Sequence, residues 1–68
     1  MDRATRLGIG AVVRVLHRRE IIGDDEIAEM LNELGDTADR QQRIGESETA
    51  NALLALARDI GRDANIGE

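Results

Sequence analysis

Between Gly23 and Gly35 the chain reads DDEIAEMLNEL (residues 24–34), and its apolar residues recur with the period of an α-helix. They stand at i, i+3, i+4 and i+7, while glutamates occupy other faces, as in a helix with one buried stripe. Asp24 suits the N-cap position, and Gly35 can adopt the left-handed conformation that ends many helices. The pattern therefore predicts a helix over residues 25–34. Its stripe is Ile27, Met30, Leu31 and Leu34.

The C-terminal third of the chain has the same period. Ser47 can cap a helix there, Glu48 falls in its first turn, and Gly61 can close it, which predicts a helix over residues 47–62. Two further apolar residues widen the stripe beyond what one neighbouring helix would cover, and a broad apolar face on a small domain indicates a second contact. The stripe is Ala50, Leu53, Leu54, Ala57 and Ile60, widened by Ala52 and Leu56.

The N-terminal segment, residues 3–22, is helical by the same criterion. Ile9, Val12, Val13 and Leu16 fall on one face. Gly8 and Gly10 each cost such a helix about 1 kcal/mol relative to alanine, so we expect it to begin only near residue 10 or 11.

Residues 36–44 are polar and almost without an apolar stripe. They predict a short, solvated connecting helix, although the segment could also continue the preceding helix through Gly35 as one rod. The expected fold is therefore all-α: one domain over residues 1–68, a small bundle of three main helices plus one short connecting helix.

The size of the chain predicts self-association. It has 68 residues and no cysteine, and a core this small leaves little net stability without a supplement such as oligomerisation. We expect a homodimer formed through apolar faces of the first and last helices. The residues predicted at this partner interface are Val12, Leu16, Ala52, Leu56 and Ile60.

The composition argues against catalysis and cofactor binding, because the chain lacks Phe, Trp, Tyr, Lys, Pro and Cys. His17 is the only histidine, and it has no cysteine or nearby serine to activate as a nucleophile. Glu26, Glu29 and Glu33 share one helical surface, but metal sites of helical bundles pair such carboxylates with histidines on facing helices. The prediction is a protein that is not an enzyme and that has no cofactor and no metal.

Charge is unevenly distributed. Residues 1–22 carry five Arg against two acidic residues, a net charge of +3, whereas residues 23–68 carry four Arg against twelve acidic residues, a net charge of −8. An acidic chain is poorly suited to nucleic acid, whose binding depends on neutralising phosphates.

Two nucleic-acid interpretations remain as alternatives. Helices at 25–34 and 36–44 could form a helix-turn-helix, and the stretch 7–10 (LGIG) has the glycine spacing of a helix-hairpin-helix. In the first case the contacts would come from Arg40, Gln41, Gln42 and Arg43.

No stretch approaches the roughly 18 apolar residues of a membrane span, and the absence of cysteine fits the reducing cytoplasm. We therefore expect a cytoplasmic, non-enzymatic protein–protein interaction module acting as a small regulator, inhibitor or assembly factor. Its expected partners are a second copy of itself, another protein, or both.

Overall fold

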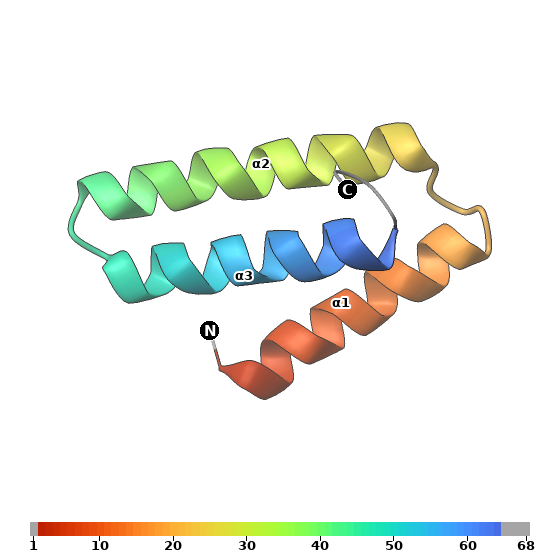
Figure 1. Ribbon diagram of the computed structural model, residues 1–68, viewed down its shortest axis with the longest axis horizontal. Helices are drawn as coiled ribbons and strands as arrows, with labels where there is room; N and C mark the ends of the chain where they lie inside the picture. Colours follow the sequence, from red (N-terminus) through yellow and green to blue (C-terminus); the bar gives the residue numbers. More distant parts are fainter. Residues whose placement is uncertain (1, 65–68) are drawn as a thin grey trace.

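The structure, a computed structural model, describes residues 2–64 and confirms an all-α fold. It consists of α1 (Arg3–Arg18), α2 (Asp24–Arg43) and α3 (Ser47–Asp63), and the described residues contain no strand. α2 and α3 lie side by side as an antiparallel hairpin, and α1 crosses at an angle (Figure 1). α2 packs along α3, and α1 packs mainly on α3, so α3 is the element that joins the bundle.

The second helix does not end at Gly35. It continues unbroken to Arg43, so the predicted separate connecting helix at 36–44 is wrong and the alternative of one long rod is confirmed. The physical reason is Ala38, which is 2% exposed and extends the buried stripe one turn beyond Leu34. Packing this face on α3 outweighs the cost of about 1 kcal/mol for a glycine inside a helix.

α1 begins at Arg3, at the start of the predicted segment 3–22 and not near residue 10 or 11, and it ends earlier than predicted. Asp2 caps it, accepting a hydrogen bond from the Thr5 backbone N–H at 2.7 Å, and this bond lowers the pKa of the Asp2 carboxyl below its usual value. The cap and the packing on α3 offset the cost of the early glycines. The helix ends at Arg18 because Glu20 has a φ of 62°, in the left-handed region, which turns the chain away.

Two similar turns end α1 and α2. The Ile21 N–H donates to the Leu16 carbonyl at 3.0 Å, and the Glu46 N–H donates to the Gln41 carbonyl at 2.8 Å. Both are the long hydrogen bond of a Schellman motif, whose left-handed residue is usually glycine. Gly45 (φ 87°) fills that position after α2, whereas Glu20 fills it after α1.

The starts of α2 and α3 differ from the predicted caps. Gly23, not Asp24, is the N-cap of α2, and the Glu26 carboxylate accepts a hydrogen bond from the Gly23 N–H at 2.9 Å. Glu46 is the N-cap of α3 and makes no side-chain capping bond. Ser47 instead accepts a hydrogen bond from the Gln42 side chain at 3.2 Å, which ties the end of α2 to the start of α3.

The core is small and lies where the three helices meet. Ile27 is fully buried, and Leu56 and Ile60 are each 3% exposed. Leu56 and Ile60 were predicted at a partner interface, and the structure places them in the centre of the single chain's own core. Half-buried apolar residues surround these three: Val13, Ile22, Met30, Leu31, Leu34 and Ala64.

Leu56→Asp should unfold the chain. It removes a buried side chain and leaves a carboxylate without a partner, which costs more than about 4 kcal/mol, comparable with the total stability of a domain this size. Leu54→Asp is the matched control, because Leu54 is 45% exposed on the same helix. Circular dichroism with urea titration should show a folded Leu54 variant and an unfolded Leu56 variant; two folded proteins would contradict the assigned core.

The two Schellman turns predict substitutions of opposite sign. Gly45→Ala should destabilise the protein by about 1–2 kcal/mol, because the added Cβ meets no atom yet forces a left-handed alanine. Glu20→Gly should stabilise it by about 0.5–1 kcal/mol, because relief of the left-handed strain exceeds the extra entropy of the unfolded chain. Urea midpoints that move in the same direction would show that one of these turns is wrongly described.

Candidate functional site

α1 is attached to the hairpin along one narrow line. Val13 packs on the core, and two ion pairs join α1 to α3. The Arg6 Nε lies 3.5 Å from the Asp59 carboxylate, and the Arg14 guanidinium lies 3.4 Å from the Asp63 carboxylate. From this contact α1 diverges from α3 toward its N-terminus (Figure 1). Most of its circumference is therefore left without a neighbour within the described chain.

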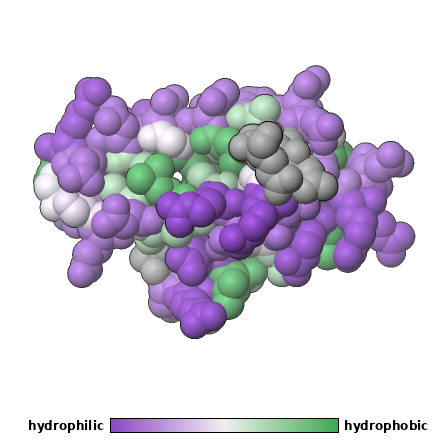
Figure 2. Space-filling model, viewed as in Figure 1, coloured by the Kyte–Doolittle hydropathy of each residue, from purple (hydrophilic) through white to green (hydrophobic). Residues whose placement is uncertain are grey.

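The face of α1 turned away from the hairpin is apolar. Leu7 is 53% exposed, Val12 is 60% exposed and Val15 is 42% exposed. Figure 2 shows an apolar patch over α1, bordered by hydrophilic side chains. A helix that is apolar on nearly all sides is normally covered on nearly all sides. We call the exposed residues Ala4, Leu7, Gly8, Val12 and Val15 the outer face of α1. Leu7 stands at its edge, beside a hollow that Asp59 and Asp63 of α3 also line.

An apolar groove lies where α1 separates from α2. Leu56 and Ile60 form its floor, Ile9 forms one wall, and Met30 and Leu34 form the other, enclosing about 480 Å³. The groove exists because α1 and α2 hardly touch: the apolar sides of both helices face a space that no side chain of residues 2–64 fills. Its lining is the type of surface into which an amphipathic helix packs.

One rim of this groove is acidic. Glu26, Glu29 and Glu33 line it from α2, and all three are exposed. They recur over seven residues of helix, about 10 Å along its axis. Within the described part of the chain no arginine or histidine forms an ion pair with them. We call Glu26, Glu29 and Glu33 the acidic rim.

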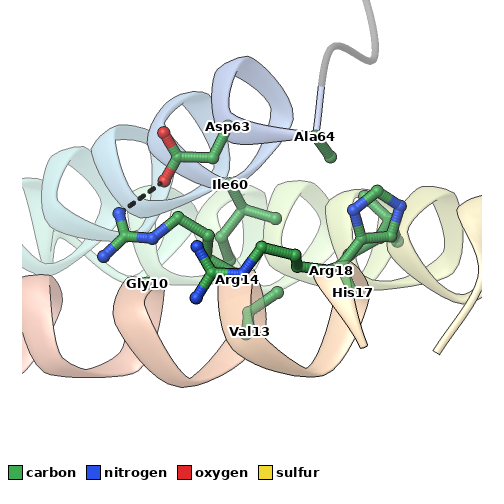
Figure 3. Close-up of a pocket in the computed structure, with 9 residues that line it drawn as sticks. Gly10, Val13, Arg14, His17, Arg18, Ile60, Asp63 and Ala64 are labelled. Carbon is green, nitrogen blue, oxygen red and sulfur yellow. Dashed lines mark hydrogen bonds and ion pairs between the residues drawn. The ribbon is translucent and has the colours of Figure 1, made fainter. Parts of the chain in front are cut away.

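A second hollow, of about 360 Å³, opens between the ends of α1 and α3. Arg14 reaches across it to Asp63, and Arg18 and His17 stand beside it (Figure 3). His17 Nε2 lies 2.8 Å from Asp24 Oδ1, so the ring links the last turn of α1 to the first turn of α2. His17 therefore has a structural contact that connects two helices. The sequence pattern offered this histidine no catalytic partner.

The predicted interface residues are dispersed. Val12 lies on the outer face, Leu16 and Ala52 are half-buried, and Leu56 and Ile60 belong to the core. Sequence reasoning missed Leu7 and Val15 on the outer face, and Ile9 and Met30 in the groove. One feature of the sequence could have identified Leu7 and Val15. Apolar residues occupy every side of α1 except the one that carries its arginines.

The residues assigned to nucleic acid lie in the last turns of α2, where side-chain contacts already engage three of them. Arg43 pairs with Asp39 at 2.9 Å, Arg40 donates to the Thr37 hydroxyl at 3.3 Å, and Gln42 binds Ser47. Gln41 is half-buried.

The elements on which both nucleic-acid interpretations relied are absent from the described residues. Residues 24–43 form one helix, so no separate recognition helix follows a turn. The stretch 7–10 lies inside α1, so its glycines form no hairpin. Binding of nucleic acid by Arg40, Gln41, Gln42 and Arg43 stays a prediction from the sequence alone.

Comparison of the chain with protein-family models, curated proteins and solved structures finds no match. Across residues 2–64, no helix combines the length and the apolar character needed to cross a membrane. In the same part of the chain no three His, Asp or Glu side chains come close enough to hold a metal ion.

The attachment of α1 depends on Asp59, whose carboxylate also pairs with Arg62 at 2.9 Å. Asp59→Asn should destabilise the protein by about 1 kcal/mol, because the Arg6 Nε is buried and already lacks a hydrogen bond within the described residues. Amide hydrogen exchange should accelerate in α1 more than in the α2–α3 hairpin. Asp39→Asn, which breaks the exposed pair with Arg43, is the control and should change stability by less than about 0.5 kcal/mol. Equal effects of the two variants would contradict the role given to Asp59.

Proposed function

We propose that this chain is a non-enzymatic protein–protein interaction module, a small regulator, inhibitor or assembly factor, that works as a homodimer. The observation that carries the proposal is the outer face of α1, with Leu7, Val12 and Val15 between 42% and 60% exposed. Three exposed branched apolar side chains on one helix favour burial against another macromolecule. The lack of cysteine supports a cytoplasmic location for the dimer.

A second copy is the partner that the size of the chain favours. Only five hydrophobic residues of the described chain are buried, and two of them are alanines. Domains with so small a core gain stability when an oligomer covers their remaining apolar surface. In a two-fold dimer each copy contributes the same patch, so every favourable contact occurs twice.

The free energy gained by burying the outer face alone is too small for a stable dimer. Covering three half-exposed side chains on both copies gives roughly 6 kcal/mol at about 1 kcal/mol each. Association costs about 4–15 kcal/mol in lost freedom of motion. The outer face by itself thus supports a weak dimer, and a stable one requires further apolar area.

The test is the molar mass by light scattering or sedimentation, at protein concentrations from about 1 to 100 μM. The wild-type chain should have twice its monomer mass at the upper end of this range. Val12→Asp should remain helical and become a monomer, because each copy would place a carboxylate in the contact. A wild-type protein that stays monomeric throughout would refute the proposal.

The matched control is Ile44→Asp. Ile44 is 71% exposed, like Val12, but it lies in the turn between α2 and α3. The same substitution there should leave the mass of the dimer unchanged. Loss of the dimer in both variants would mean that the outer face of α1 has no special part in self-association.

A further inference from the structure

The acid-rimmed groove between α1 and α2 is a large apolar recess on the same side of the core as α1. Its walls contain three of the longest apolar side chains of the protein, Ile9, Met30 and Leu34, and its floor is the core itself. The outer face of α1 needs further apolar area to form a stable dimer. The groove, which lies beside α1, has such area.

The charge of the acidic rim indicates what kind of helix would bind in the groove. Glu26, Glu29 and Glu33 place negative charge along one edge of the groove, without a cation to balance it among the described residues. An occupant that carries a row of arginines beside an apolar face gains from this charge, whereas an acidic occupant is repelled. The groove thus fits a basic amphipathic helix.

α1 of a second copy has these properties. The segment that contains it, residues 1–22, has a net charge of +3. Arg18 is exposed, whereas Arg14 already pairs with Asp63 of its own chain. Arg18 falls at the edge of the outer face, so docking of that face brings a guanidinium toward the glutamates. Arg18 has no ion-pair partner within residues 2–64.

We propose that the groove of each copy receives the outer face of α1 from the other copy, with Arg18 set against Glu29 and Glu33. This inference rests on the homodimer proposed above and specifies its contact. Because each copy both donates α1 and accepts one, the two contacts are identical and are related by a two-fold axis. α1 stays on its own α3 in this arrangement, since the outer face is the one turned away from the hairpin.

The experiment is a charge swap between two variants. The groove variant is Glu29→Arg/Glu33→Arg, and the helix variant is Arg18→Glu, which keeps the Arg14–Asp63 pair. Alone, each should dimerise at least about tenfold more weakly than the wild type, because like charges face one another in both contacts. Mixed in equal amounts, they should form a heterodimer, because both contacts then join opposite charges. Sedimentation of the mixture and of each variant measures this directly.

Two controls test whether a change in net charge or a loss of folding could explain the result. Glu46→Arg/Glu48→Arg changes the net charge as the groove variant does, but both residues stand at the α2–α3 turn, so its dimer should match the wild type. Circular dichroism checks that the helix variant is folded, as expected because Arg18 makes no ion pair within residues 2–64.

Each result decides something specific. Restoration of the dimer only in the mixture supports the groove contact. A wild-type dimer that the groove variant leaves unchanged overturns this inference while the homodimer stands, and so does a mixture of folded variants that stays monomeric. A monomeric wild type refutes the homodimer and, with it, the groove contact.

Discussion

The packing of α2 against α3 around Ile27 is the contact on which the rest of the structure depends. Ile27 is fully buried, and the two α3 residues that enclose it, Leu56 and Ile60, are nearly so. α1 adds Val13 to this cluster but little else. The hairpin is therefore the stable unit, and α1 is positioned by it. The groove and the outer face both follow from the weaker packing of α1, because a helix held along one line leaves its other sides open.

The open sides are complementary in charge. Arginines are concentrated on α1, and the glutamates of the rim belong to α2, the helix that α1 barely touches. Within one chain, α1 directs Arg6 and Arg14 to α3 instead, where Asp59 and Asp63 receive them. A second copy is a simple way to bring the remaining arginines and the unpaired glutamates together while covering apolar surface, which is why we favour self-association as the function.

Much of the fold could be predicted from the sequence, because helical periodicity is local. The stripe of Ile27, Met30, Leu31 and Leu34 gave the right helix and the right buried face. The second helix was predicted too short because Gly35 resembled an end, whereas Ala38, a small residue with little weight in a pattern, carries the buried face onward. The end of α1 was predicted too late because nothing in its composition marks Glu20 as left-handed.

The interface was harder to predict than the fold, for a physical reason. An apolar stripe says that a face is buried, but not whether its own chain or another chain covers it. Leu56 seemed surplus on α3 because only one neighbouring helix was assumed, and the structure gives α3 two. Leu7 and Val15 were overlooked because they lie outside the apolar stripe predicted for α1.

The arrangement also has a consequence for how the chain is made. Of the three helices α1 leaves the ribosome before the other two, yet its packing surface lies mainly on α3, which follows it in the chain. Until residues 47–63 have emerged, α1 is a short basic helix with no template, and isolated helices of this length are barely stable in water. The α2–α3 hairpin closes through a short turn and can form quickly. During synthesis α1 therefore has its packing surface only after the residues of α3 have emerged.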